Sequence, residues 1–513
     1  MLGGFKDEEF IRSGFAAGFK VGHLGGSNSI VSKNSSSVSK NPIAALEKIN
    51  QEVSLGRIAG PFSSPPIKNL VISPLALRQK ANSNKFRLLH NLSAPYDGTS
   101  VNANIPDNEA KVQYANLLKA IEIILINDCK FMAKSDIADA FRLIPLAPSD
   151  YRLMGVKLNN QYYYDKCLPM GCRSSCRIFE RFSDALVYIL ATKYNVHFVV
   201  KVIDDFLFLA PSLEECQRAL SAFQDLAATI NLPLAAHKTV GPSQIISFLG
   251  IEINTLDSSC KLPVEKLQEY RSLVDLTLTS TKISMQKAKS LLGKLNFASA
   301  VVPAGRTFLR RLYDLTAGLY IPSKLRKLRA RHKKDLRLWS RFLKDHPGKS
   351  LLATIPSSKP FAATIQSDSC PMGYAGVWHP HWLQGKFPLR WRTFDIQFLE
   401  IFPIFLLLSM LAPKFQGERV LILCDNLPIV HSLNNLSTKN KRVMILIRML
   451  TMLLMKHNLT ISARHVPGKL NYLCDYLSRH QANPQLLDHH ALNSSPLPVP
   501  NALRPQNIKF SDL

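Results

Sequence analysis

Two adjacent carboxylates, Asp204 and Asp205, lie between two strongly apolar segments, and this arrangement restricts the fold more than any other feature of the sequence. The flanking segments, VHFVVKV and FLFLAPS, are rich in β-branched, aliphatic and aromatic residues. They predict two buried strands that meet at a tight connection. Ionised carboxylates in apolar surroundings are costly unless they are paired or bind a metal ion. The pair therefore needs a turn or a cation to make it tolerable.

A second acidic stretch, FMAKSDIADAFRLIPL (131–146), places Asp136 and Asp139 where an apolar strand gives way to a turn or helix start. Carboxylates from two neighbouring strands are the oxygen ligands that Mg²⁺ prefers. Adjacent side chains of a strand point to opposite faces, so Asp204 and Asp205 are not expected to be equal ligands. Asp136 and Asp204 are the predicted primary pair, with Asp205 in support. The alternative is a capping Asp136 and a turn-forming acidic pair, which the pair alone would favour.

Four more acidic residues lie at the edges of separate predicted elements nearer the C-terminus. They are Asp368 in the predicted hairpin TIQSDSCPMGYAGVW, Glu400 at the start of the apolar helix FLEIFPIFLLLSML, Asp425 after the strand RVLILC, and Asp475 in LCDYLSRH. Together they suggest a second site for two Mg²⁺ ions, whereas each alone is more simply a cap or a solvated residue. Pro403 predicts that this helix begins near Glu400, because proline fits a first turn and breaks a helix interior.

The chain is strongly basic, since 64 Lys and Arg residues oppose 37 Asp and Glu residues, a net charge of +27. An excess of this size indicates a polyanionic partner. Many of the basic residues lie in SKLRKLRARHKKDLRLWSRFLK (323–344), where apolar residues recur at roughly helical spacing. A helix with a solvated basic face is one interpretation. Contact with nucleic-acid phosphates is the interpretation that the charge excess favours.

The cysteines, the N-terminus and the apolar runs bear on the cellular compartment and on membrane insertion. Nine scattered cysteines without a CxxC pair predict reduced thiols in an intracellular protein, with no zinc site. The N-terminus, MLGGFKDEEF, is not a secretory signal. The longest apolar run, 398–411, is too short to cross a bilayer and contains Glu400 and Pro403. No membrane association is expected.

The motifs around the first carboxylates resemble those of reverse transcriptases. DIADAF looks like their first catalytic motif, VIDD like the motif usually written Tyr-x-Asp-Asp, and LPMGCRSSC (168–176) like the Pro-x-Gly segment under the templating base. FRLLHNLSAPYDGTSVN (86–102) is similar to the fingers segment, AHKTVGP (236–242) to the lysine-bearing loop, and SFLGIEI (247–253) to the primer-grip hairpin. Val202 replaces the family's usual aromatic residue, which implies altered packing under the primer end.

The resemblance implies roles for four further residues. Arg87 would supply a planar donor fork to the incoming triphosphate, and Lys238 would lie near the leaving pyrophosphate. Gly171 would let the backbone approach the template–nucleotide pair without a Cβ atom. Phe141 occupies the place of the steric gate that excludes a 2′-hydroxyl, and an ordinary core aromatic is the other interpretation.

The four acids nearer the C-terminus resemble the Asp-Glu-Asp-Asp set of ribonuclease H. HVPGKLNYLCDYLSR (465–479) looks like the end of that domain in retrotransposons, and His465 would assist product release or be a solvated loop residue. GRIAGPFSSPP, KTVGP, LLGKLNFA and GRTFLRR are most similar to the reverse transcriptase–ribonuclease H polyprotein of DIRS-type retrotransposons, over roughly 50–480. Those elements usually also encode a tyrosine recombinase. No convincing recombinase motif occurs here, so a separately encoded recombinase is an expected partner.

The resemblance implies an α/β (α+β) architecture in five segments. They are a Gly/Ser-rich extension (1–60, with 28–42 flexible), fingers and palm (61–260), a helical thumb and basic connection (261–357), a mixed-sheet ribonuclease H-like domain (358–482) and a disordered tail (483–513). Implied ligands are an RNA template, a DNA primer, an RNA–DNA hybrid, dNTPs, and two Mg²⁺ ions per site, for which Mn²⁺ could substitute. The expected location is the cytoplasm, the nucleus or both.

Two rival interpretations come from other functional classes. A domesticated or decayed retroelement protein would bind nucleic acid without catalysis, and an RNA-packaging protein would act through its Ser/Asn-rich N-terminus. The presence of all the expected carboxylates argues against decay.

Overall fold

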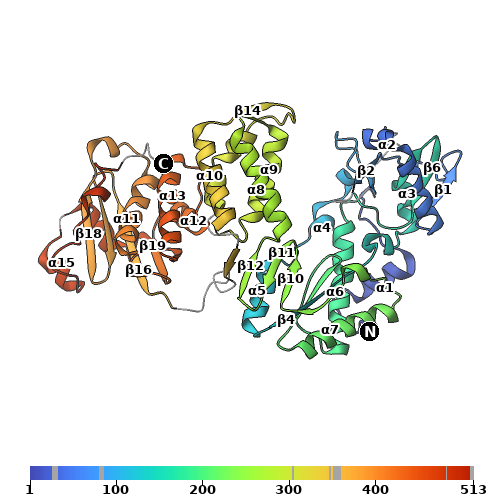
Figure 1. Ribbon diagram of the computed structural model, residues 1–513, viewed down its shortest axis with the longest axis horizontal. Helices are drawn as coiled ribbons and strands as arrows, with labels where there is room; N and C mark the ends of the chain where they lie inside the picture. Colours follow the sequence, from blue (N-terminus) through green and yellow to red (C-terminus); the bar gives the residue numbers. More distant parts are fainter. Residues whose placement is uncertain are drawn as a thin grey trace. The chain divides into compact units, whose positions relative to one another are not determined.

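The computed structural model describes residues 1–25, 33–79, 86–302, 305–345, 348–350, 360–480 and 482–508 (Figure 1). The chain divides into two compact units, 1–249 with 253–257 and 250–252 with 258–513. The expected boundary at residue 357 lies outside the described residues. Within the stretches described, no helix has both the length and the apolar character that crossing a bilayer requires.

The first unit contains most of the predicted fingers and palm. Its helices are α1 (Glu8–Ala17), α2 (Ser36–Lys40), α3 (Pro42–Ser54), α4 (Asp107–Ala110), α5 (Leu117–Ile126), α6 (Ser175–Tyr194) and α7 (Leu213–Thr229). Its strands are β1 (Ile58–Phe62), β2 (Leu75–Gln79), β3 (Phe86–His90), β4 (Phe131–Asp136), β5 (Gly155–Leu158), β6 (Gln161–Asp165), β7 (Val199–Val202), β8 (Asp205–Ala210), β9 (Val240–Ser243) and β10 (Ile245–Phe248).

The central sheet of this unit has four antiparallel strands in the order β7-β8-β4-β9. Phe206 and Phe208 of β8 are fully buried and pack against Phe223 of α7, with ring centroids 4.7 and 5.4 Å apart. Only two residues, Ile203 and Asp204, separate β7 from β8. The prediction of two buried strands joined by a tight connection is therefore confirmed.

The N-terminal segment contributes to this fold. The expected flexibility of 28–42 is corrected for its described part, because Ser36–Lys40 is helical and Pro42 occupies the first turn of α3. Asn34 links the segment to two strands: its side chain accepts the Leu75 N–H at 2.9 Å and donates to the Lys157 carbonyl at 2.8 Å. A Ser/Asn-rich composition predicted flexibility, whereas these polar side chains form the caps and hydrogen bonds that order the segment.

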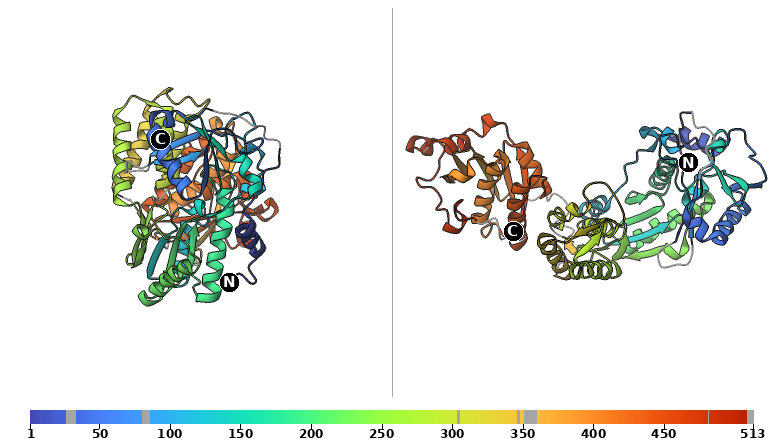
Figure 2. Two further views of the ribbon diagram at one scale, coloured as in Figure 1. Left: turned by 90° about the vertical axis from the view of Figure 1, so that its right-hand side faces the viewer. Right: turned by 90° about the horizontal axis from the view of Figure 1, so that it is seen from above.

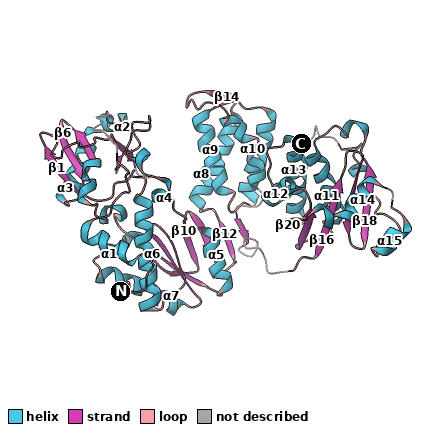
Figure 3. Ribbon diagram, turned by 180° about the vertical axis from the view of Figure 1, so that it is seen from behind, coloured by secondary structure: helices cyan, strands magenta, loops and turns pink. Residues whose placement is uncertain are grey.

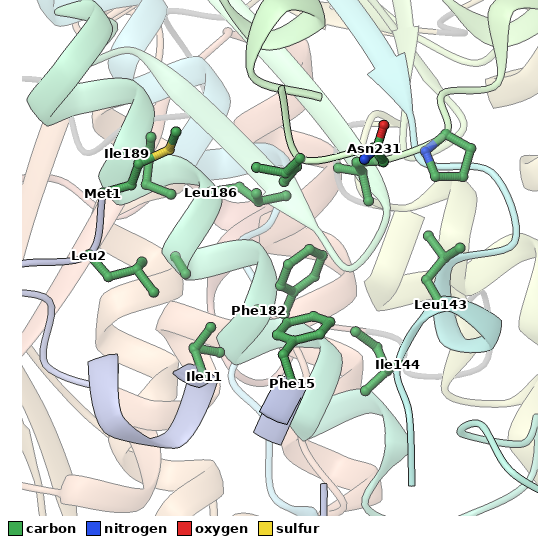
Figure 4. Close-up of a pocket in the computed structure, with 14 residues that line it drawn as sticks. Met1, Leu2, Ile11, Phe15, Leu143, Ile144, Phe182, Leu186, Ile189 and Asn231 are labelled. Carbon is green, nitrogen blue, oxygen red and sulfur yellow. The ribbon is translucent and has the colours of Figure 1, made fainter. Parts of the chain in front are cut away.

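Helix α1 packs against α6 beside an apolar cavity of about 390 Å³ (Figure 4). Phe15 of α1 and Phe182 of α6 meet edge to face there, with ring centroids 5.4 Å apart. Ile11 and Leu186 also line this cavity. The apolar face of α1 is thus part of the core of the first unit, which ties the N-terminal segment to α6.

The second unit begins with a group of three helices. They are α8 (Val264–Thr279), α9 (Met285–Ala298) and α10 (Ala330–Asp345), which lie side by side in Figure 1. The short strands of this part are β12 (Ser259–Lys261), β13 (Lys282–Ser284), β14 (Leu325–Lys327) and β15 (Gly348–Ser350). Strand β11 (Ile251–Asn254) has its first two residues in the second unit and its last two in the first. Leu336, Trp339 and Leu343 of α10 are fully buried, which agrees with the apolar spacing expected of a helix over 330–345. The start of the basic segment differs from the expected helix, because Leu325–Lys327 forms β14.

The rest of the second unit is a five-stranded mixed sheet with helices on both faces (Figures 2 and 3). Its strands are β16 (Ala363–Ser369), β17 (Gly373–Trp378), β18 (His381–Lys386), β19 (Arg419–Cys424) and β20 (Thr460–His465), in the order β18-β17-β16-β19-β20. Its helices are α11 (Ile396–Leu411), α12 (Leu427–Asn435), α13 (Lys441–Lys456), α14 (Tyr472–Arg479) and α15 (Pro484–His489).

Adjacent residues of β17 show the two faces of this sheet. Tyr374 belongs to the core formed with α11 and α13, whereas Ala375 packs with Leu477 of α14 on the opposite face. Alternation along a strand explains this separation. The expected α/β fold with a mixed sheet is confirmed.

The C-terminal segment corrects the expectation of a disordered tail over 483–513, as far as residue 508. Asn483 caps α15 by accepting the Leu486 N–H at 2.8 Å, and Leu487 is buried. Trp382 of β18 donates its indole N–H to the Asn493 carbonyl at 2.8 Å. The Pro- and Asn-rich composition therefore supplies a helix start and a cap rather than an unstructured end.

Candidate active sites

The first carboxylate cluster lies at the end of the β7–β8 hairpin. Asp205 is the register partner of Asp136, the last residue of β4, and Asp204 lies in the two-residue turn. The Ile137 N–H donates to the Asp204 carbonyl at 3.0 Å, which joins the turn to the end of β4. The structure thus brings together the three acids predicted from the sequence.

These carboxylates repel one another in a partly dehydrated setting. Burial raises the pKa of Asp204, and the neighbouring Asp136 raises it further. The pKa of Asp205 is raised by the same two causes in the same order. Lys238 supplies the opposing charge, since its Nζ lies 2.7 Å from Asp136 Oδ1. A cluster of this kind favours a bound cation.

A cavity of about 330 Å³ connects this cluster with most of the predicted nucleotide-binding residues. Arg87 from β3, Phe141, Asp136, Asp204 and Lys238 all line it. Asp205 is not among the described lining residues. Asp204 therefore borders the cavity and Asp205 does not, which is consistent with the expectation that the two acids are not equal ligands.

Phe141 both packs in the core and borders the cavity, the two positions expected of a core aromatic and of a gate residue. Its ring packs edge to face on Phe179 of α6, with centroids 5.6 Å apart and an interplanar angle of 78°. The same residue lines the cavity beside the carboxylates. Core packing therefore fixes the orientation of a ring that also borders the nucleotide-sized space.

Gly171 is required for a reason that the sequence did not reveal. Its φ of 129° lies in a region that favours glycine, and a Cβ atom would overlap the carbonyl oxygen of His90. Asn102 donates its side-chain N–H to the Gly171 carbonyl at 2.8 Å. The predicted approach of a template–nucleotide pair is not needed to explain this glycine, because contacts within the chain already exclude a side chain.

Three residues that were not predicted, Glu180, Ser183 and Lys201, hold the turn that carries Asp204. Ile203 has a φ of 56°, a conformation that costs a β-branched residue about 1–3 kcal/mol. Its N–H donates to Glu180 Oε2 at 3.0 Å, and its carbonyl accepts the Ser183 hydroxyl at 2.6 Å. Buried Lys201 pairs with Glu180 at 2.7 Å. One turn of α6 thus clamps the residue that precedes Asp204.

Helix α3 also contributes to the cavity, although nothing in the sequence indicated this. Lys48 and Glu52 line it. Glu52 accepts from Arg142 at 2.8 Å, and Arg142 also pairs with the buried Asp165 at 2.7 Å. The segment expected to be an extension therefore forms part of the wall of the first site.

The second carboxylate cluster forms where two parallel strands end. Strands β16 and β19 pair in parallel, with Gln366 opposite Leu423. Asp368 and Asp425 each follow that pair by two residues, so they emerge at the same edge. Glu400 of α11 has a carboxylate oxygen within 4.8 Å of one of Asp425. Asp475 of α14 completes the group, and its charge is among the causes that, after burial, raise the pKa values of Asp368 and Glu400.

Glu400 is the most strongly perturbed acid of this group. Burial raises its pKa to about 9, and Asp368, Asp425 and Asp475 contribute to the rise. Burial is also the main cause of the raised pKa of Asp368. Glu400 Oε2 and Asp425 Oδ1 are buried without a hydrogen-bond partner among the described residues. Unpartnered carboxylate oxygens at one point fit an oxygen-preferring cation.

Cys424 was not predicted as part of this site. Its sulfur lies with carboxylate oxygens of Glu400 and Asp425 in a group whose atoms are all within 4.8 Å of one another. Burial raises the pKa of Cys424 to about 12, which keeps it a thiol at neutral pH. A protonated thiol is a poor ligand, so the two carboxylates are the better candidates.

Two residues that were not predicted, Ser478 and Arg479, and the predicted His465 contact these acids. Ser478 donates its hydroxyl to Asp368 at 2.7 Å, and Arg479 pairs with Asp475 at 2.8 Å. Exposed His465 donates from Nε2 to the Asp425 carbonyl at 3.1 Å. His465 is the last residue of β20 and pairs with Cys424 of β19, so it is an exposed strand-end neighbour of the site rather than a loop histidine.

Pro403 corrects the prediction for the start of α11. The helix begins at Ile396, with Asp395 accepting the Phe398 N–H at 3.1 Å, so Pro403 lies in its interior. Proline has no N–H for the carbonyl of Leu399 four residues earlier. The Ser369 hydroxyl donates to that carbonyl at 2.9 Å instead. A serine next to Asp368 thus replaces the missing hydrogen bond and joins β16 to the helix beside Glu400.

Comparison with known families identifies part of the chain. Residues 79–253 match the family described as "Reverse transcriptase (RNA-dependent DNA polymerase)". Protein P of Heron hepatitis B virus is 27% identical over 183 residues, 35% of this chain and 22% of that protein. The Gag-Pro-Pol polyprotein of Human T-cell leukemia virus 2 is 25% identical over 293 residues, 54% of this chain and 18% of that protein. The chain thus spans about a fifth of the length of these curated relatives.

Solved structures resemble a larger part of the chain. The foamy viral protease–reverse transcriptase in complex with RNA/DNA hybrid has a TM-score of 0.54 and 13% identity, covering 94% of this chain and 58% of that one. The same protein in complex with dsDNA has a TM-score of 0.51 and 14% identity, covering 86% of each chain. The chain therefore contains a reverse transcriptase domain of the retroviral or hepadnaviral type within a fold shared with these structures.

Proposed function

We propose that this chain is an RNA-directed DNA polymerase that also has ribonuclease H activity. The main support is the convergence of Asp136, Asp204 and Asp205 at one end of a sheet, inside the segment that matches the reverse transcriptase family. A second convergence of acids in the mixed-sheet part of the chain supports the nuclease.

The acids of both sites would hold divalent cations, with Mg²⁺ as the proposed ion and Mn²⁺ as a substitute. Asp136 and Asp204 would be the main ligands of the first site, with Asp205 in support, because their mutual repulsion favours a cation there. Asp368, Glu400, Asp425 and Asp475 would form the second site, where buried oxygens of Glu400 and Asp425 have no partner among the described residues. When bound, two cations neutralise charge on the attacking and leaving oxygens of a phosphodiester reaction.

Other residues of the first site would bind and orient a deoxynucleotide. Arg87, on β3, would direct its planar donors to the triphosphate, and Lys238 would hold a phosphate oxygen or donate a proton to the leaving pyrophosphate. Phe141 would limit the space at the 2′ position of the sugar. The Gly171 backbone, held by His90 and Asn102, would support the template side.

In the second site, His465 would assist release of the cleaved product. Its ring is exposed and contacts the Asp425 main chain, so it can reach solvent and the carboxylate cluster. This role requires no covalent step at the histidine.

The proposed substrates are an RNA template with a DNA primer, dNTPs and an RNA–DNA hybrid. The solved foamy viral proteins contain dsDNA or RNA/DNA hybrid, and the net charge of +27 suits such polyanions. The detailed motifs further favour an origin in a DIRS-type retrotransposon. A separately encoded tyrosine recombinase as partner and action in the cytoplasm or nucleus belong to the same proposal.

The test measures the two reactions in parallel. Asp204→Asn should reduce primer extension on an RNA template by more than about 100-fold while hybrid cleavage remains, and Asp425→Asn should have the reverse effect. Matched controls are Asp128→Asn in the first unit and Asp488→Asn in the second, which change exposed acids. Hybrid binding by a wild-type protein that neither extends nor cleaves would favour the non-catalytic binding protein instead.

A further inference from the structure

A strongly basic cavity of about 390 Å³, called here the basic pocket, lies in the second unit away from the four acids. Two parts of that unit line it with cationic side chains. One side has Arg331 and Lys334 of α10 together with Arg310 from the preceding segment. The other side has Lys441 and Arg448 of α13 together with Lys439 just before that helix. Asp314 is the one carboxylate among the described lining residues, and Arg331 already pairs with it at 3.0 Å.

A buried ion pair joins the two sides of the basic pocket. Arg448 is 4% exposed and donates two hydrogen bonds to Asp335 of α10, which is fully buried. The same guanidinium lies over the ring of Phe308, 4.6 Å from its centroid. Thr307 donates to the Leu436 carbonyl at 2.8 Å nearby. The helical part and the mixed-sheet part are thus held together beneath the pocket.

The charges of the basic pocket are poorly balanced from within the chain. Asp335 pairs with Arg448 and lies 3.8 Å from Arg311, and Asp314 pairs with Arg331. Within the described part of the chain, Lys334, Lys439 and Lys441 add exposed positive charges that these two acids do not pair with. Burial and the neighbouring Arg448 lower the pKa of Arg311, which also lines the cavity. Crowded like charges are relieved when an anion binds between them.

We propose that the basic pocket binds the phosphate backbone of a nucleic acid, so that α10 and α13 hold the same strand. A cavity of this size accommodates a nucleotide-sized group rather than a whole duplex. Guanidinium forks and ammonium groups on both sides suit phosphate oxygens. This assignment deepens the proposed function and rests on it, since a hybrid is the substrate expected to pass from the helical part to the nuclease-type acids.

The experiment compares two double variants in binding a fluorescein-labelled RNA–DNA hybrid in EDTA at several salt concentrations. Lys334→Gln/Lys439→Gln removes one exposed cation from each side of the basic pocket, and neither side chain is buried. Lys344→Gln/Lys456→Gln makes the same change on the same two helices outside it. The pocket variant should lower the slope of log affinity against log salt by about 0.9 for each lost phosphate contact, and the control should leave it unchanged.

Equal slopes for the two double variants would overturn the assignment. A free phosphate compound is the other source of the same chemistry, so thermal unfolding with pyrophosphate forms a second arm. If pyrophosphate stabilised the wild type but not the pocket variant, while the pocket variant kept the wild-type salt slope for the hybrid, the pocket would bind a free phosphate compound. That result would also overturn the nucleic-acid assignment. Failure of the proposed function can be told apart from failure of this assignment. In that case the wild type would neither extend a primer nor cleave a hybrid, whatever the salt slopes of the double variants.

Discussion

The two carboxylate clusters have similar ligands, but the fold holds them in different ways. In the first, Asp204 lies in a hairpin turn whose strained residue, Ile203, is clamped by side chains of α6. In the second, Asp368 lies near the end of β16, Asp425 directly follows the parallel strand β19, and Glu400 is buried in a helix against them. One cluster depends on hydrogen bonds to a turn, and the other on burial between regular elements.

Their charge balance differs as well. Lys238 directly contacts Asp136 in the first cluster, at 2.7 Å. In the second, Arg479 contacts the peripheral Asp475, whereas Glu400 has a pKa raised to about 9. The first cluster should therefore be sensitive to loss of its clamp, and the second to protons and to loss of its packing.

The largest effect that separates the clusters is expected for Glu180→Ala. Without this carboxylate, the Ile203 N–H and buried Lys201 lose a partner, and the turn that carries Asp204 can relax. Loss of such a supporting contact typically costs about 10–100-fold in activity or metal affinity. Primer extension at varied Mg²⁺ should show a higher Mg²⁺ requirement, while hybrid cleavage is unchanged.

Two further variants show whether Glu180 acts by positioning. Glu180→Gln keeps an oxygen that can accept the Ile203 N–H and should recover part of the activity. Glu122→Ala removes a half-exposed acid of α5 whose ion pair within the described residues is with Lys119, and it should behave like the wild type. An unchanged Mg²⁺ requirement in Glu180→Ala would contradict the positioning role.

The corresponding support in the second cluster is tested by Ser369→Ala. This change leaves the Leu399 carbonyl in α11 without its donor, which should cost about 1–3 kcal/mol of unfolding free energy. Pro403→Ala restores a backbone N–H at the position that normally bonds this carbonyl, so it should suppress the loss. A double-mutant cycle measured by denaturant unfolding gives the coupling, and additive effects would refute the compensation.

These contrasts also show what could be predicted from the sequence. The site acids could be found because each lies beside an apolar strand or helix pattern in an order typical of a family. Glu180 and Ser369 could not, because each acts on a backbone group distant in the chain, 23 residues away at Ile203 and 30 at Leu399. The interior position of Pro403 was missed for the same reason, since the hydroxyl that tolerates it comes from another element.

Composition was a weaker guide than these motifs. The Pro- and Asn-rich residues near the C-terminus predicted disorder, yet Asn483 caps a helix and Asn493 accepts a hydrogen bond from Trp382. The contribution of α3 to the first site could not be predicted, because it depends on the ion pair between Glu52 and Arg142, which lie 90 residues apart.

Phe141→Val is expected to affect only the first site. The smaller side chain would open the cavity beside Asp136 and Asp204, and about tenfold weaker discrimination against ribonucleotides should follow. Single-nucleotide extension with dNTP and rNTP measures this ratio. Phe131→Val, which changes another partly buried aromatic residue packed against the same core without lining the cavity, is the matched control. Equal discrimination by wild type and Phe141→Val would remove the gate assignment and leave core packing as its role.

The smallest effect expected concerns pH and the second cluster. With a pKa of about 9 in the folded protein against an ordinary value of 4.5, Glu400 is protonated near neutral pH without a cation. The folded state then binds a proton that the unfolded state lacks, so this contribution to stability is lost as pH rises towards 9. A divalent cation competes with that proton, so Mg²⁺ should raise the Tm more at high pH, by a few degrees. Thermal unfolding in EDTA and in Mg²⁺ measures this difference, which Glu400→Gln should abolish and Asp204→Asn should largely preserve. If Asp204→Asn abolished it instead, the stronger coupling between protons and cations would belong to the hairpin cluster, and the contrast between a half-buried clamped turn and a buried helix acid would be reversed.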